Sequence, residues 1–353
     1  MEHGVVLAGG SGTRFWPESR KLRSKQFLDL TGGGPMVRQT LDRLRAVVPP
    51  ERLWIVAGRK DSRHLSPRSL GIPKGNILLE PEGRNTAPAI ALAAACIAKT
   101  DPDAVIVATP ADHAVRNVRG FHAVIRRGLR LAAATGRLVT LGVPPTHPAT
   151  GYGYIERGLP FPGRTGGAFQ VVRFTEKPDM ATAERFLRSR RFHWNSGIFL
   201  FRVDTFMDRL GRFLPEVHRR ILKAAGGGRE RLGRRLREAY RGMPSISVDY
   251  GILEKERGIL MLPADVGWSD LGTWRSLHEF LDHRGGNVTF GDVILSDCRN
   301  TLVRTDKGLV AVLGMEDTVV IRNGNSVLVC PRSRSEDVKE MVEEVRRRYP
   351  SLA

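Results

Sequence analysis

The chain has 353 residues, of which 41% are hydrophobic and 26% charged, values typical of a globular protein with a large core. No run of 18 apolar residues occurs, which excludes a transmembrane helix, and the early start of a strand pattern leaves no room for a signal peptide. The net charge of +19 would suit a nucleic-acid binder, but the basic residues are spread along the chain. Small anionic substrates explain a basic cleft without any nucleic acid, so we expect neither a nucleic-acid nor a membrane partner.

The three cysteines, Cys96, Cys298 and Cys330, are odd in number and widely spaced, and they form no C-x-x-C motif. Such a pattern favours a reduced, cytoplasmic protein over a disulfide-bonded one.

The stretch that organises the chain begins with Val5–Ala8, a short apolar run typical of a buried strand. The next residues, Gly9–Arg14, read GGSGTR, and several further basic residues follow. Glycines let a backbone turn sharply and bring its N–H groups close to an anion. The run matches neither a P-loop nor a full dinucleotide fingerprint. Taken alone, it fits an ordinary glycine-rich turn as well as a polyphosphate site.

The following segments alternate between strand and helix patterns. Strands are predicted at 53–57, 77–79 and 104–108, and a helix at 36–47. This rhythm is typical of βαβ units, so we predict an α/β fold with a Rossmann-like, mostly parallel or mixed sheet flanked by helices. A helical, arginine-rich region is expected at 204–240.

Two polar segments follow predicted strands. The segment 80–88, EPEGRNTAP, leads into an alanine-rich helix that Asn85 or Thr86 can cap. It also offers acceptors, including Glu80, of the kind that the donors of guanine require. Asp112 follows the strand at 104–108, at the edge where α/β sheets bind ligands. In isolation, the sequence favours a helix cap or a turn residue at Asp112.

Further polar residues come from the middle of the chain. Gly153, within a strand pattern, indicates close backbone approach by a ligand or else a β-bulge. Glu176 and Asn195 have the hydrogen-bonding capacity to hold sugar hydroxyls, and Lys177 can meet a phosphate. A Glu-Lys pair by itself is usually a solvated salt bridge.

From residue 285 onwards the sequence pattern changes to short β-rich segments separated by turns that contain Gly, Asn and Asp. We predict a small β-coil of left-handed β-helix type, although no strict hexapeptide repeat is present. A final helix is expected from about Ser335, with Glu336 and Asp337 in its first turn.

Several segments carry a resemblance to a known family. The run GGSGTRFWPESR…KQFL from Gly9 to Leu28 is similar to the signature of the sugar-1-phosphate nucleotidylyltransferases. Its Phe15-Trp16-Pro17 form resembles the mannose-1-phosphate guanylyltransferase (GDP-mannose pyrophosphorylase) branch. The later segments that resemble this family are EPEGRNTAPAI, PADH, GYGYI, FTEKPD, WNSGIF, DYGILEK and the stretch ending in Asp270.

The resemblance implies transfer of GMP from GTP to mannose 1-phosphate with Mg²⁺, by in-line attack of the sugar phosphate on the α-phosphorus, giving GDP-mannose and pyrophosphate. It implies a nucleotidyltransferase catalytic domain at 1–284 and a small β-coil domain with a terminal helix at 285–353, and it allows a homodimer. The implied catalytic residues are Arg14, Lys25, Asp112 and Asp270, with Asp112 and Asp270 holding the metal. The implied nucleotide-binding residues are Leu7, Ala8, Gly9, Gly10, Ser11, Gly12, Thr13, Glu80, Arg84, Asn85 and Thr86, and the implied sugar-phosphate-binding residues are Gly153, Glu176, Lys177 and Asn195.

Two alternatives stay open at this point. A different sugar 1-phosphate, such as glucose 1-phosphate, or a different nucleotide would use the same phosphate apparatus. More remotely, the chain could be a catalytically silent nucleotide-sugar sensor or a nucleic-acid-binding protein.

Overall fold

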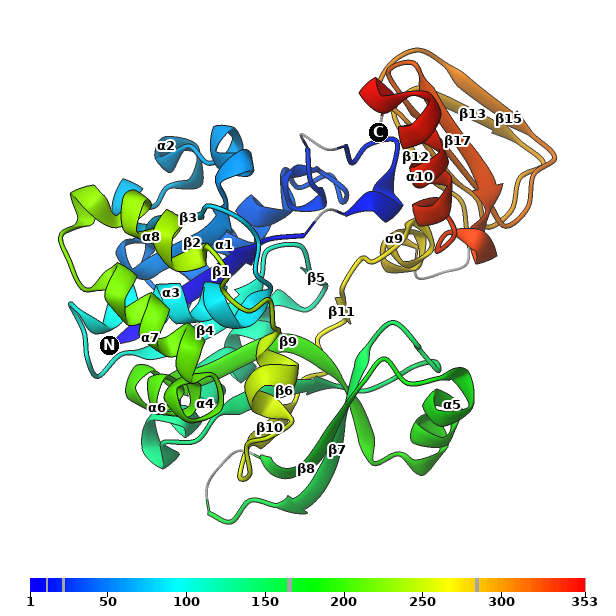
Figure 1. Ribbon diagram of the computed structural model, residues 1–353. Helices are drawn as coiled ribbons and strands as arrows, with labels where there is room; N and C mark the ends of the chain where they lie inside the picture. Colours follow the sequence, from blue (N-terminus) through cyan, green and yellow to red (C-terminus); the bar gives the residue numbers. More distant parts are fainter. Residues whose placement is uncertain (11, 21–22, 164–166, 283–285, 353) are drawn as a thin grey trace. The chain divides into compact units, whose positions relative to one another are not determined.

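The computed structural model describes residues 1–10, 12–20, 23–163, 167–282 and 286–352 (Figure 1). The chain divides into two compact units, which are described separately. Unit 1 comprises Met1–Gly9, Thr40–Ala111 and Val115–Trp268, and unit 2 comprises Gly10–Gln39, Asp112–Ala114 and Ser269–Ala353.

Unit 1 is built on a nine-stranded mixed sheet in the order β3-β2-β1-β4-β9-β6-β10-β8-β7. The first four strands in this order run parallel, and β9 joins them antiparallel to β4. The predicted α/β mixed sheet is therefore confirmed. The strands are β1 (Glu2–Ala8), β2 (Leu53–Gly58), β3 (Ile77–Glu80), β4 (Val105–Pro110), β6 (Val139–Val143), β7 (Gly153–Pro160), β8 (Phe169–Glu176), β9 (Phe192–Arg202) and β10 (Leu260–Pro263).

The helices of unit 1 include the predicted helical region at 204–240, which forms three consecutive helices, α6 to α8. They are α2 (Pro67–Leu70), α3 (Thr86–Ala98), α4 (Val118–Thr135), α5 (Met180–Ser189), α6 (Val203–Phe213), α7 (Pro215–Ala225) and α8 (Leu232–Tyr240), together with α1 (Met36–Arg45), within which the chain passes from unit 2 to unit 1.

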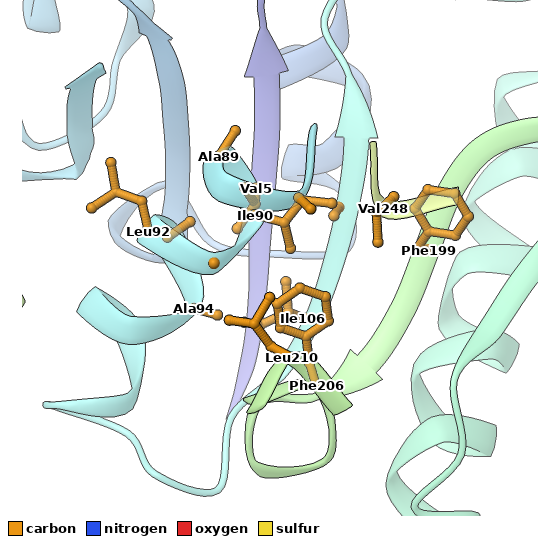
Figure 2. Close-up of a cluster of buried hydrophobic side chains, with 14 of the residues drawn as sticks. Val5, Ala89, Ile90, Leu92, Ala94, Ile106, Phe199, Phe206, Leu210 and Val248 are labelled. Atoms are coloured by element: carbon orange, nitrogen blue, oxygen red, sulfur yellow. The ribbon is translucent and has the colours of Figure 1, made fainter. Parts of the chain in front are cut away.

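The alanine-rich helix α3 lies inside a large apolar cluster of unit 1. Ten of its thirteen residues are buried, because small side chains let it lie close to the sheet on one side and to α6 and α7 on the other. Figure 2 shows residues of α3 in one cluster with Val5 of β1, Ile106 of β4, and Phe206 and Leu210 of α6. This packing fixes the start of α3, where the segment 80–88 ends.

Alternation along the strands gives the sheet a second buried face. Val5 belongs to the α3 cluster, whereas its neighbour Val6 is equally buried but lies outside that cluster, as expected for side chains that alternate between faces. Helix α4 approaches the sheet closely at Gly128, where an added Cβ would lie 2.9 Å from the side chain of Leu200 in β9. Helix-covered parallel strands of this kind present their carboxyl ends for ligand binding.

Unit 2 contains the predicted β-coil. β12 (Val288–Phe290), β14 (Leu302–Thr305) and β16 (Thr318–Asn323) pair in parallel, and β17 (Ser326–Pro331) adds to β16 antiparallel. A second, two-stranded parallel sheet is formed by β13 (Val293–Ser296) and β15 (Val310–Leu313). Helices α9 (Trp274–Leu281) and α10 (Val338–Arg348) complete the unit, and the two-residue strands β5 (Ala114–Val115) and β11 (Trp268–Ser269) lie where the chain passes between units.

The core of unit 2 joins residues from both ends of the chain. Phe15 and Trp274 are fully buried and pack edge to face, with ring centroids 4.9 Å apart. The guanidinium of Arg304 in β14 pairs with Glu18 and donates to the main-chain carbonyl of Leu30 at 3.2 Å. The same apolar cluster includes Trp16, Leu28, Leu30, Met36, Leu302, Val319, Ile321, Leu328, Val338 and Val342.

The terminal helix differs slightly from its prediction. α10 begins at Val338 rather than near Ser335, because a 3-10 turn at Arg332–Arg334 precedes it and Asp337 takes the N-cap position. None of the three cysteines forms a disulfide bond. Among the described residues, no helix has the length and hydropathy needed to cross a membrane.

Candidate active site

The glycine-rich turn of unit 2 requires glycine at two described positions. Gly10 and Gly12 have φ angles of 97° and 59°, in the region that side-chain-bearing residues rarely adopt. A Cβ on Gly12 would also lie 2.4 Å from the Cβ of Lys25. The turn therefore holds its backbone against Lys25, and the 3-10 helix Thr13–Phe15 follows at once. Ser11, predicted in this turn, lies outside the described residues.

The residues just before the turn end the first strand of unit 1. Leu7 and Ala8 are buried at the carboxyl end of β1, and Gly9 is exposed. The prediction that a buried strand leads into this turn is confirmed.

Lys25 links two of the predicted catalytic residues. Its side chain is 7% exposed, and Nζ donates to Oδ2 of Asp112 at 2.8 Å and to the main-chain carbonyl of Asp270 at 2.5 Å. Burial raises the pKa of Asp112, but the charges of Lys25 and His113 and the hydrogen bond from Lys25 outweigh it and hold the pKa below its usual range. Asp112 is therefore ionised at neutral pH. Lys25, Asp112 and Asp270, far apart in sequence, thus meet around one ammonium group.

Arg14 is placed differently. Its side chain is 43% exposed and lies 3.7 Å from the Glu336 carboxylate, an exposed pair of a kind that contributes little to stability. Its Nε is buried and has no hydrogen-bond partner in the described part of the chain. No described hydrogen bond or ion pair joins Arg14 to Lys25, so the structure connects three of the four predicted catalytic residues.

The donor set around Lys25 fits a hard divalent cation. Oδ1 of Asp270 accepts from the amide of Gly272 at 2.9 Å, which orients that carboxylate. Mg²⁺ is commonly held by one or two carboxylates, with substrate phosphates and water completing its octahedron. Within the described ranges no group of three or more His, Cys, Asp or Glu side chains could hold a metal ion. Asp112 and Asp270 suit a metal that arrives with a phosphate ligand.

The predicted nucleotide loop in unit 1 is braced by a distant segment. Asn85 caps α3 by accepting from the amide of Thr86 at 2.9 Å, with a φ of 67°. Oγ1 of Thr86 accepts from the amide of Val248 at 2.9 Å, and the main-chain carbonyl of Arg84 accepts from the amide of Ile246 at 3.3 Å. The segment 246–248 therefore fixes the backbone between Arg84 and Thr86.

Glu80, proposed from sequence as an acceptor for a base, is buried. Its Oε1 accepts from the hydroxyl of Tyr240 at 2.9 Å, and burial raises the pKa of Glu80 to about 7. Its neighbour Glu82 is half exposed and pairs with Arg84 at 2.7 Å. The Tyr240 contact was not predicted, because 160 residues separate the partners. Leu232, Leu236 and Tyr240 recur at helical spacing, and this apolar face was a signal for the burial of Tyr240.

On the sugar side, Gly153 makes room for Glu176. The two residues are paired across β7 and β8, and a Cβ on Gly153 would lie 1.9 Å from Oε1 of Glu176. The register shifts in this strand pair come later, after Glu156. The close neighbour of Gly153 is therefore a carboxylate of the protein itself, and the bulge alternative is wrong at this position. The approach of a ligand to Gly153 stays a prediction.

Asn195 in β9 meets Glu176 and a third residue. Its Nδ2 donates to Oδ1 of Asp249 at 2.7 Å and to Oε1 of Glu176 at 3.4 Å. Lys177 is exposed, has a φ of 47°, and lowers the pKa of both carboxyl groups against the larger effect of burial, which raises them. Sequence reasoning missed Asp249. It begins a five-residue π-helix in the DYGILEK segment, and such helices are frequent at functional sites.

Comparison with known families gives two matches along the chain. The nucleotidyl transferase family matches residues 3–284. The chain belongs to this family. A second match, to the MannoseP isomerase/GMP-like beta-helix domain, covers residues 291–345 and agrees with the parallel β-coil of unit 2.

Individual proteins are similar to this chain over nearly its whole length. Mannose-1-phosphate guanylyltransferase ManC of Salmonella typhimurium is 41% identical over 351 residues, which cover 97% of this chain and 72% of that protein. Xanthan biosynthesis protein XanB of Xanthomonas campestris pv. campestris is 40% identical over 348 residues, with 97% and 73% covered. A solved structure from Thermus thermophilus, described as a mannose-1-phosphate geranyltransferase, has 34% identity and a TM-score of 0.89 over 98% of this chain and 99% of that chain.

Proposed function

We propose that this nucleotidyl transferase transfers GMP from GTP to mannose 1-phosphate, giving GDP-mannose and pyrophosphate. The observation that carries the proposal is the ammonium of Lys25, which joins the Asp112 carboxylate to Asp270 directly behind the glycine-rich turn. A buried cation, two carboxylates and a glycine-rich backbone can together bind a nucleoside triphosphate and a divalent metal. The names of the similar proteins support guanine and mannose as the base and the sugar.

The proposed reaction needs no protein nucleophile. An oxygen of the sugar phosphate attacks the α-phosphorus of GTP in line, the new P–O bond forms, and the bond to the β-phosphate oxygen breaks as pyrophosphate leaves. Positioning and charge neutralisation supply most of the rate enhancement in such transfers. Mg²⁺ held by Asp112 and Asp270 would neutralise phosphate charge.

The remaining residues receive roles by their place in the chain. In this proposal Lys25, Arg14 and the turn from Gly9 to Thr13 bind the triphosphate. Leu7, Ala8, Glu80, Arg84, Asn85 and Thr86 line the nucleoside, and Gly153, Glu176, Lys177 and Asn195 surround the sugar phosphate. We also propose a domain boundary after residue 284, supported by the two family matches, and a cytoplasmic location, where nucleotides and sugar phosphates are present. We further propose a homodimer, which light scattering tests by measuring twice the mass of the chain.

A substrate panel tests the proposal. Pyrophosphate release is measured with GTP, ATP, UTP and dTTP, each combined with mannose 1-phosphate or glucose 1-phosphate, with and without EDTA. The proposal expects the highest kcat/KM for GTP with mannose 1-phosphate and loss of activity in EDTA. Preference for another pair would assign a different sugar nucleotide. Absence of pyrophosphate release together with salt-dependent binding to random DNA would overturn the enzyme assignment.

A further inference from the structure

The amide of Asn195 is already occupied by protein partners. Its Nδ2 donates to Asp249 at 2.7 Å and to Glu176 at 3.4 Å, and its Oδ1 accepts from the amide of Gly197 at 3.1 Å. A primary amide has two N–H donors and one carbonyl oxygen. Both donors and one side of the acceptor are therefore committed, and Asn195 has little capacity left for a direct bond to a sugar.

The two carboxylates that share this amide are close enough to affect each other. Burial raises the pKa of Glu176, and the charge of Asp249 raises it further; burial also raises the pKa of Asp249. Two carboxylates in a poorly hydrated place repel each other unless a donor lies between them. The Asn195 amide is that donor, since within the described ranges no other side chain donates a hydrogen bond to either carboxylate.

The three residues differ in how firmly they are held. Asp249 begins the π-helix Asp249–Leu253, whose preceding segment is bonded to the base of α3 through Thr86. Asn195 lies within the sheet, where Trp194 and Asn195 of β9 pair with β6. Glu176 is the last residue of β8 and keeps its place beside Gly153 because no Cβ stands there. Asp249 is therefore the most firmly held of the three, and it supports Asn195, which in turn supports Glu176.

We infer that Asp249 is a positioning residue for sugar binding: its carboxylate fixes the orientation of the Asn195 amide, and that amide in turn holds the Glu176 carboxylate toward the sugar. The inference rests on the proposed function. Glu176 then accepts hydrogen bonds from sugar hydroxyls, which are donors that an ionised carboxylate binds well. Asp249 contributes to the affinity for mannose 1-phosphate without contacting the nucleotide.

The test compares KM for the two substrates in single variants. Asp249→Ala leaves the Asn195 amide without its stronger acceptor and is expected to raise KM for mannose 1-phosphate about 10- to 100-fold, the range of one hydrogen bond to a charged group. KM for GTP should stay within about twofold. Asp249→Asn keeps an acceptor oxygen in place and should restore most of the sugar affinity. Glu254→Gln removes a neighbouring exposed charge without touching Asn195 and serves as the matched control.

A double variant separates positioning from direct contact. If Asp249 acts through Glu176, Asp249→Ala should add little to the loss already caused by Glu176→Ala. Should Asp249→Ala fail to fold, Asn195→Asp carries the test, because it keeps the side-chain shape, removes the bridging donor and should raise the same KM. Equal effects on both substrates, an unchanged sugar KM, or fully multiplicative losses in the double variant would overturn the inference. Absence of wild-type activity with mannose 1-phosphate would instead refute the proposed function.

Discussion

The buried carboxyl group of Glu80 should make the free energy of unfolding depend on pH. The substitution Glu80→Gln should remove this contribution. Glu80 is 6% exposed, and among the described residues its side chain accepts one hydrogen bond, from the hydroxyl of Tyr240 at 2.9 Å. Glu80→Gln keeps an acceptor for that hydroxyl and the shape of the side chain, and it removes only the ability to ionise. We expect the variant to be relatively more stable than the wild type at alkaline pH.

The magnitude follows from the pKa of Glu80, which burial raises from 4.5 to about 7 in the folded state. Between these two values the native state holds a proton that the unfolded state has released, so the contribution of Glu80 to stability is present below pH 4.5 and is lost as the pH rises through 7. Since one pKa unit corresponds to about 1.36 kcal/mol, the loss amounts to about 3 kcal/mol.

Urea unfolding of wild type and Glu80→Gln at about pH 4.5 and about pH 8 measures this difference. The free energy of unfolding of the variant, relative to wild type, should increase by about 3 kcal/mol between the two pH values. Glu82→Gln is the matched control, because Glu82 is half exposed and its pair with Arg84 is a surface pair. If the difference in free energy of unfolding between wild type and Glu80→Gln is the same at both pH values, the reasoning is refuted.

Three further predictions concern the catalytic and sugar residues. Lys25→Ala should lower kcat about 10²- to 10³-fold and also lower the urea midpoint, since Asp112 loses the cation 2.8 Å away; an unchanged kcat contradicts the role of Lys25. Gly153→Ala places a Cβ where Oε1 of Glu176 lies and should raise KM for mannose 1-phosphate about tenfold. An unchanged KM would show that the Glu176 carboxylate does not bind the sugar. Asp112→Asn and Asp270→Asn, assayed across a Mg²⁺ titration, should each reduce pyrophosphate release, with the double variant losing little more than either single one; multiplicative losses would argue against a shared ion.

Local sequence chemistry was sufficient for the parts of the fold that depend on neighbouring residues. The apolar run Val5–Ala8 became a strand buried on both faces, and the glycines after it adopt positive φ angles. Asn85 caps α3 as its position before an alanine-rich run indicated. In each case the signal and its structural consequence lie within a few residues of each other.

The sequence was less informative where partners come from distant segments. Asp249 contacts Asn195 across 54 positions, and Tyr240 reaches Glu80 across 160. Such pairs form because packing of helices against the sheet brings polar groups into places where each must find a partner. The motif DYGILEK pointed to its own segment without indicating which of its side chains would be used.

The shared core of unit 2 has a consequence for how such proteins can be altered or recombined. Phe15 and Trp16, the aromatic residues that follow the glycine-rich turn, pack with residues of the β-coil and of α10. Arg304 of the β-coil forms an ion pair with Glu18 and donates a hydrogen bond to the main-chain carbonyl of Leu30. The indole of Trp16 also donates to the main-chain carbonyl of Leu352 at 2.8 Å. Removing or exchanging residues 285–353 would therefore remove the packing partners of the segment that contains Lys25. The family comparisons divide the chain near residue 284, but residues 10–39 and 269–353 belong to one compact unit. A chimaera should therefore exchange these two segments together.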